Sequence, residues 1–109
     1  MSAQSVGLPS IAAAVRGRLE ARVINSEGRY QFHLTGPGGG DLTVTLRGGR
    51  ATVSEGTHGA ADCEVTMTLQ DAAGLLHGSL SAIQAFFSGR FAITGDMAAA
   101  MRLGRLLER

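Results

Sequence analysis

Residues 30–53 read YQFHLTGPGGGDLTVTLRGGRATV, and this stretch decides the fold class. Apolar side chains occupy every second position from Tyr30 to Leu34, and residues 42–47 and 51–53 continue the alternation. Because successive side chains of a strand point to opposite faces, a period of two predicts strands with one apolar and one polar face. Gly48-Gly49 suits a tight hairpin turn, since both central residues of such a turn have positive φ. The stretch therefore predicts three consecutive strands.

The flanking sequence predicts two more strands and four helices. Residues 63–69 alternate in the same way, and Phe91 and Ile93 mark a short fifth strand. Before the strands, Ile11, Val15, Leu19 and Val23 recur every four residues, which predicts a helix from Pro9 to Val23. After them, Asp71, Ser81 and Asp96 are expected to cap helices that extend to His77, to Ser88 and nearly to the C-terminus. We predict an α+β fold with a mostly antiparallel five-stranded sheet, covered on one face by helices.

The last predicted helix is unusually apolar. Arg102, Arg105 and Arg109 form one polar stripe, and nearly every other position is Met, Ala or Leu. An apolar arc this wide exceeds the stripe that a core-facing helix needs. It must contact the sheet, neighbouring helices, a ligand, a membrane or a partner.

Composition narrows the class of protein. The 109 residues, 44% hydrophobic and 17% charged, fit one globular domain spanning 1–109, of which we expect residues 1–8 to be flexible. A net charge of +1 with scattered charges leaves no electrostatic footprint for nucleic acid. No apolar run approaches the roughly 20 residues that span a bilayer, and we expect a cytoplasmic protein. The single cysteine, Cys63, excludes an internal disulfide and is expected to be a small buried side chain.

No catalytic or metal-binding constellation is evident. His33, His58 and His77 share no metal-ligand spacing, and we expect them at the surface. Residues 36–40 are glycine-rich but lack the G-K-[ST] ending of a phosphate loop and join two strands. No serine lies in a G-x-S-x-G elbow. We predict no metal, no cofactor and no enzymatic activity.

Several segments in order resemble one known family. Leu75-Leu76-His77-Gly78 is followed by Ala82 to Phe87, then by SGRFAITGD at residues 88–96 and a Met/Ala/Leu helix. Residues 28–32 and 62–67 add to the likeness. Together they resemble the sterol carrier protein 2 (SCP-2) lipid-transfer domain, over nearly the whole chain from about Pro9. The C-terminal residues 106–109 are not a peroxisomal S-K-L signal, so the resemblance is to a free-standing bacterial-type member.

The resemblance implies an apolar tunnel between sheet and helices that takes a fatty acid, a fatty acyl-CoA, a sterol or a phospholipid, with sterol the less expected ligand. A transient membrane or enzyme partner and a monomeric or weakly dimeric state fit such a carrier. The alternative is a protein-interaction or dimerisation module of the same fold, in which the side chains expected to line the tunnel fill a solid core instead. The expected tunnel residues are Phe32, Leu34, Val44, Leu46, Leu76, Ile83, Phe86, Phe87, Phe91, Ile93, Met97 and Met101.

Overall fold

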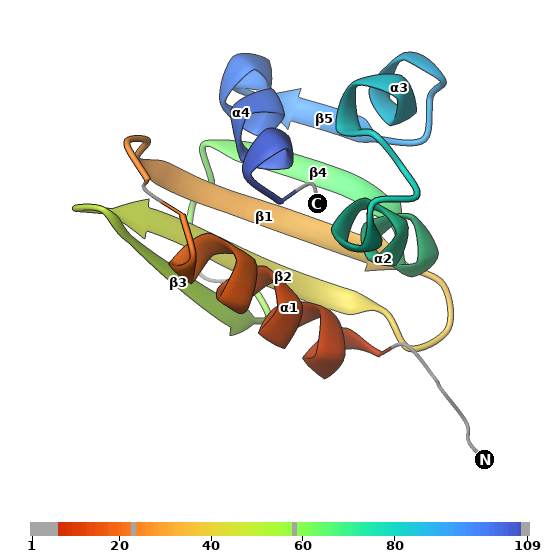
Figure 1. Cartoon of the computed structure of the whole chain (residues 1–109), viewed down its shortest axis with the longest axis horizontal. Coiled ribbons are helices and arrows are strands. Elements are labelled where there is room, and N and C mark those ends of the chain that lie inside the picture. The colour runs from red at the N-terminus through yellow and green to blue at the C-terminus, as the bar shows by residue number, and fades with distance from the viewer. Residues whose placement is uncertain (1–6, 23, 58, 108–109) are drawn as a thin grey trace.

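The computed structural model describes residues 7–22, 24–57 and 59–107 and has two layers, a sheet and a set of helices (Figure 1). In chain order the elements are α1 (Leu8–Glu20), β1 (Gly28–Thr35), β2 (Gly40–Arg47), β3 (Arg50–Glu55), β4 (Cys63–Thr68), α2 (Leu69–His77), α3 (Ala82–Phe87), β5 (Ala92–Gly95) and α4 (Met97–Leu107). The predicted fold class, an α+β fold with a five-stranded sheet, is confirmed.

The five strands form one mixed sheet in the order β3-β2-β1-β4-β5. All neighbouring pairs are antiparallel except β1 and β4, which run parallel with Phe32 opposite Val65. Gly48 and Gly49 both have positive φ, at 59° and 80°, so the predicted hairpin turn is confirmed. The sheet is therefore mostly antiparallel, as the alternation predicts.

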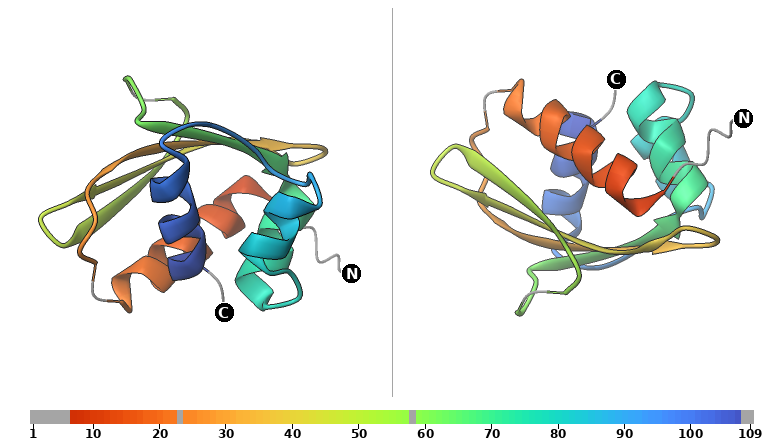
Figure 2. Two further views of the ribbon diagram at one scale, coloured as in Figure 1. Left: turned by 90° about the horizontal axis from the view of Figure 1, so that it is seen from above. Right: turned by 90° about the horizontal axis from the view of Figure 1, so that it is seen from below.

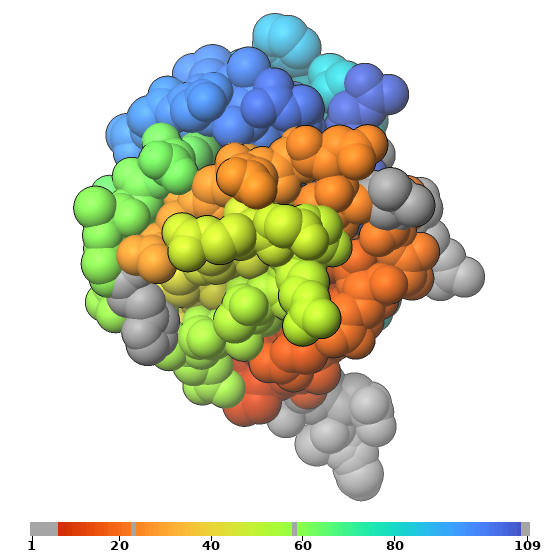
Figure 3. All heavy atoms as spheres, turned by 90° about the vertical axis from the view of Figure 1, so that its left-hand side faces the viewer, coloured from red at the N-terminus to blue at the C-terminus, as the bar shows by residue number. Residues whose placement is uncertain are grey.

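All four helices lie on the same side of the sheet, as both views of Figure 2 show. The first helix contacts β2 and β3, α2 contacts β1 and β4, and α4 contacts β4 and β5. The third helix packs on α4. Figure 3 shows one end of this arrangement, where the yellow-green β2–β3 hairpin lies above the red α1, and an orange segment that leads into β1 separates the hairpin from the blue α4. The inner side chains of the sheet are thereby enclosed.

Local capping explains where the helices begin and end. Ser81 accepts a hydrogen bond from the Gln84 backbone N–H at 3.4 Å, and Asp96 accepts one from the Ala99 N–H at 3.0 Å, so both predicted caps are confirmed. The second helix differs, because Thr68 rather than Asp71 caps it and it begins at Leu69.

Both bounds of the first helix also differ from the predicted Pro9 and Val23. The first helix ends at Glu20 rather than Val23. It begins at Leu8, whose N–H donates to the Gly38 carbonyl at 3.0 Å, so Leu8 is held within the segment expected to be flexible. Residues 1–6, Val23, His58 and Arg109 lie outside the described residues.

Candidate functional site

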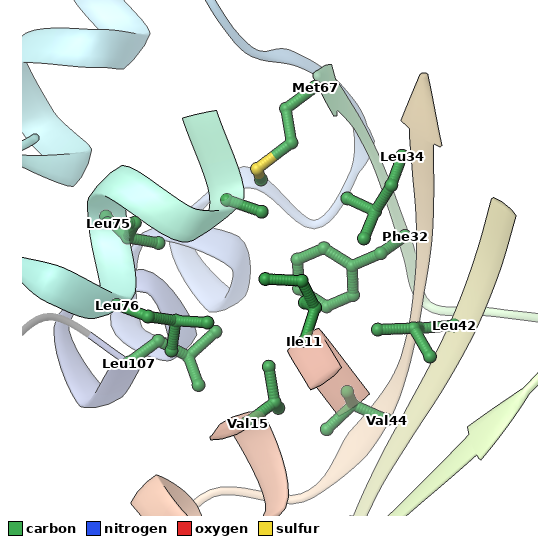
Figure 4. A pocket seen from close by; sticks show the side chains of 11 residues that line it. Ile11, Val15, Phe32, Leu34, Leu42, Val44, Met67, Leu75, Leu76 and Leu107 are labelled. Atoms are coloured by element: carbon green, nitrogen blue, oxygen red, sulfur yellow. The ribbon is translucent and has the colours of Figure 1, made fainter. Parts of the chain in front are cut away.

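An apolar cavity lies between the sheet and the helices (Figure 4). Its volume is about 20 Å³, roughly the room that one water molecule needs. In Figure 4 the ring of Phe32 lies at the centre, with side chains of the sheet on one side and side chains of the helices on the other. Every lining residue is apolar: Ile11, Val15, Phe32, Leu34, Leu42, Val44, Met67, Ala72, Leu75, Leu76 and Leu107.

A second apolar cavity of similar size lies towards β5 and α4. Its lining includes Phe32, Met67, Leu75 and Leu107, which also line the first cavity. Beyond these shared side chains it is lined by Val65, Ala82, Phe91, Ile93, Ala100, Met101 and Gly104. The two cavities together form an apolar interior that extends from α1 to β5.

Periodicity brings these side chains together. On α1, Ile11 and Val15 are four residues apart and therefore share the helix face that lies over the sheet. On the strands, the inner positions alternate with outer ones, so Phe32 and Leu34 both point towards the helices. The second helix contributes Leu75 and Leu76 just before it ends at His77, and its C-cap Gly78 has a φ of 87°, which favours glycine.

One cation joins three helices beside the first cavity. The Arg18 guanidinium donates hydrogen bonds to the Leu76 carbonyl at 2.8 Å and to the Leu107 carbonyl at 3.2 Å. Both carbonyls lie at helix C-termini, which carry partial negative charge and lack partners within their own helix. Arg18 therefore holds α2 and α4 against α1 at two residues that line the cavity.

Seven of the twelve sequence-predicted tunnel residues line at least one of the two cavities. Three line only the first, three only the second, and Phe32 lines both. In sequence order they are Phe32, Leu34, Val44, Leu76, Phe91, Ile93 and Met101.

The other five line neither cavity. Leu46 is fully buried in the core, and Phe86 is half-buried. Ile83, Phe87 and Met97 are exposed, with 44%, 81% and 45% of their surface accessible. These three placements correct the expectation that the large side chains of α3 and the start of α4 point inward. The buried residues of α3 are the small ones, Ala82 and Ala85, and Phe86 packs against the core only in part.

Sequence reasoning missed several lining residues, although their signal was present. Ile11 and Val15 belong to the apolar stripe that predicted α1. Leu42 and Met67 continue the same alternation as Phe32 and Leu34. Their inward direction followed from the period, but which inner positions border free space depends on how the helices pack.

The outer face of the sheet carries the nearest approach to a polar site. His33 on β1 lies between Asp41 on β2 and Glu64 on β4, with its Nδ1 and Nε2 each 2.9 Å from a carboxylate oxygen. The hydrogen bond to Glu64 raises the pKa of His33 most, and the hydrogen bond to Asp41 raises it further. Burial raises the pKa of the Cys63 thiol, which packs in the core as predicted. Within residues 7–22, 24–57 and 59–107, no group of three or more His, Cys, Asp or Glu side chains has an arrangement that could hold a metal ion.

The same described ranges contain no helix that is long and apolar enough to cross a membrane.

Comparison with known proteins places this arrangement in a family. The model of the SCP-2 sterol transfer family matches residues 12–108. Human Sterol carrier protein 2 is 38% identical over 73 residues, which are 65% of this chain and 13% of the human protein. Hydroxysteroid dehydrogenase-like protein 2 of Xenopus tropicalis is 33% identical over 89 residues, 81% of this chain and 21% of that protein. The chain therefore spans only a small part of these relatives.

A solved structure agrees with the fold. The solution structure of palmitated SCP2L2 from Aedes aegypti aligns with a TM-score of 0.77 at 22% identity, covering 94% of this chain and 96% of that one. At this identity the likeness shows the fold alone, whereas the family match rests on the sequence. The chain belongs to the SCP-2 sterol transfer family.

Proposed function

We propose that this chain binds a long-chain lipid in the apolar interior between its sheet and its helices, and that it carries the lipid without chemically changing it. The observation that carries the proposal is the first cavity, whose eleven lining residues are all apolar and come from both layers of the fold. An apolar chain placed there would exchange water for contacts with side chains that are already desolvated. Each buried methylene contributes about 0.8 kcal/mol.

The ligand class proposed is a fatty acid, a fatty acyl-CoA, a phospholipid or a similar acyl compound. The Aedes aegypti protein of the same fold was solved in a palmitated form, which supports an acyl ligand here. The cavity of about 20 Å³ is too small for a whole acyl chain. Binding would therefore require the lining side chains to move apart, and the ligand would fill the space that they leave. Action in the cytoplasm, with transient contact to a membrane or enzyme, is part of the proposal.

Displacement of a fluorescent fatty acid by unlabelled palmitate tests this function. We expect saturable binding and a palmitate complex in native mass spectrometry. The variant Ala72→Leu adds bulk to a buried residue that lines the first cavity and should weaken palmitate binding about tenfold, since overpacking costs 1–3 kcal/mol. Its control, Ala98→Leu, makes the same change at an exposed position of α4 and should leave binding unchanged. No saturable binding by the parent chain would contradict the proposal.

The second candidate is a dimerisation module, and Phe87 favours it. Phe87 has 81% of its surface accessible and lies beside Phe86 with ring centroids 5.5 Å apart, and Ile83 of the same helix is also exposed. Apolar side chains that gather on a surface are typical of interaction sites. Sedimentation equilibrium over a range of concentrations tests this candidate. A dimer that Phe87→Asp converts to a monomer would support it, and a monomer at every concentration would exclude it.

A further inference from the structure

The two apolar cavities have four lining residues in common, Phe32, Met67, Leu75 and Leu107. Side chains that line both cavities lie between them. We propose that these four residues, here called the partition, move to join the cavities, and that the partition determines the length of the acyl chain that the protein accepts. The inference rests on the proposed lipid-binding function and adds what limits the ligand.

The partition is assembled from four different elements. Phe32 comes from the middle of β1 and Met67 from β4, whereas Leu75 comes from α2 and Leu107 is the last residue of α4. All four are buried. No single backbone movement would displace all of them. Opening would therefore proceed by rotation of side chains, with the unbranched thioether of Met67 the most adaptable of the four.

The space on the two sides of the partition differs in character. The first cavity is bordered by larger aliphatic residues such as Ile11, Leu42 and Leu76. The second is bordered partly by small residues, Ala82, Ala100 and Gly104. A chain that pushes apart the side chains around the first cavity ends at the partition as long as the partition stays closed. A longer chain gains the second cavity only if the partition opens, so affinity would stop rising with length at the point where the partition is met.

Two adjacent leucines provide a matched test. Leu75 and Leu76 are neighbours on α2 and are each 3% exposed, but Leu75 belongs to the partition and Leu76 lines only the first cavity. Displacement of a fluorescent fatty acid would be measured with saturated fatty acids from octanoate to stearate. We expect Leu75→Ala to bind stearate about tenfold more tightly, relative to octanoate, than the parent does, which corresponds to about two further buried methylenes.

Leu76→Ala should enlarge the first cavity alone and leave the length at which affinity levels off unchanged. The inference is overturned if both variants shift that length equally, or if Leu75→Ala keeps the parent's length profile. Should either alanine variant fail to fold, Leu75→Val and Leu76→Val provide the same comparison with a smaller loss of packing.

A readout without lipid separates this inference from the proposed function. Xenon enters apolar cavities, and its position can be followed by NMR from the methyl shifts of Val44, which lines only the first cavity, and Val65, which lines only the second. In Leu75→Ala xenon should perturb both valines, and in Leu76→Ala only Val44. If the parent binds no fatty acid but xenon behaves in this way, the proposed function and the limit on chain length both fail, whereas the separation of the two cavities by Leu75 stands. If xenon perturbs Val44 alone in both variants, the partition is refuted.

Discussion

Replacing Arg18 by methionine tests whether one cation holds the helices together over the apolar interior. The substitution keeps an unbranched apolar side chain but removes the donors to the Leu76 and Leu107 carbonyls. A hydrogen bond to a charged group contributes about 1.5–3 kcal/mol, and a cation at a helix C-terminus about 0.3–1 kcal/mol. Because Arg18 is only half-buried and the bond to Leu107 is long at 3.2 Å, water would replace part of both bonds. We expect the free energy of unfolding to fall by about 2 kcal/mol.

Urea denaturation followed by circular dichroism measures this loss. With an m-value of about 1–3 kcal/mol/M, the midpoint should fall by about 1 M, while the slope stays the same. The control is Arg105→Met, which removes the same charge from an exposed position of α4 where no hydrogen bond to the described residues is recorded. If the two midpoints agree within about 0.2 M, Arg18 contributes only surface charge, and the inference that it ties α2 and α4 to α1 is refuted.

Three further predictions concern the outer face of the sheet, the end of β5 and the surface of α3. Glu64 and Asp41 raise the pKa of His33. The stability that these two ion pairs add is therefore fully present below the pKa of about 6.5 that His33 has in the unfolded chain, and it is lost as the pH rises through the higher pKa of the folded chain. Urea denaturation at a series of pH values should show this loss of stability in the parent but not in His33→Gln. At Gly95, with a φ of 94°, an added Cβ would collide with the Asp62 carbonyl oxygen, so Gly95→Ala should destabilise by more than about 1 kcal/mol. Gly89→Ala is the control, because a Cβ at Gly89 meets open space although φ is also positive at 79°. It introduces only backbone strain and should lower the urea midpoint clearly less than Gly95→Ala does. Phe87→Ala should change the free energy of unfolding by less than about 0.5 kcal/mol because the ring is exposed, whereas Phe91→Ala should cost about 3–5 kcal/mol; equal losses would contradict the placement of α3.

Local chemistry accounts for the parts of the fold that the sequence predicts. The Gly48-Gly49 turn and the caps at Ser81 and Asp96 each depend on residues within a few positions of one another, and all three are found as expected. The pairing of β1 with β4 is different, because it joins residues about 33 positions apart, such as Phe32 and Val65. Nothing in either strand specifies that the two run parallel, since the alternation is the same for both directions.

Burial also departs from simple alternation where a loop covers the sheet. Gln31 and Thr43 occupy polar positions on the outer face, yet each is only 3% exposed. The Thr43 hydroxyl donates to the Gln31 side-chain oxygen or to the Gly56 carbonyl, each 2.8 Å away, and the Gln31 amide donates to the Leu42 carbonyl at 3.1 Å. A polar residue in a strand predicts the outer face, but whether that face is wet depends on a loop elsewhere in the chain.

Packing between distant elements also explains why the sequence predicted some tunnel residues wrongly. The sequence predicts Ile83 and Phe87 on α3 and Met97 on α4 as tunnel residues, yet all three are exposed. Where α3 meets α4 the contact is made by small residues, and a Cβ on Gly104 would lie 3.0 Å from the Ala82 Cβ. Such close contact leaves no room for Ile83 or Phe87 on the inner side. Small residues determine how closely two helices approach, and the hydrophobicity of the side chains alone does not predict where such a close contact forms.

A nearly filled interior is compatible with lipid binding, and it makes a specific demand on the energetics. Because the cavities are small, the parent loses little packing when no ligand is present, and the cost of separating side chains of the first cavity such as Ile11 and Leu42 falls on the binding step. That cost is the same for every ligand that opens the interior, whereas the gain of about 0.8 kcal/mol per methylene grows with chain length. Short chains should therefore bind poorly and longer ones increasingly well until the available length is used. A solid core with no capacity to open would show no saturable binding at any chain length, so the length series distinguishes a carrier from a filled module of the same fold.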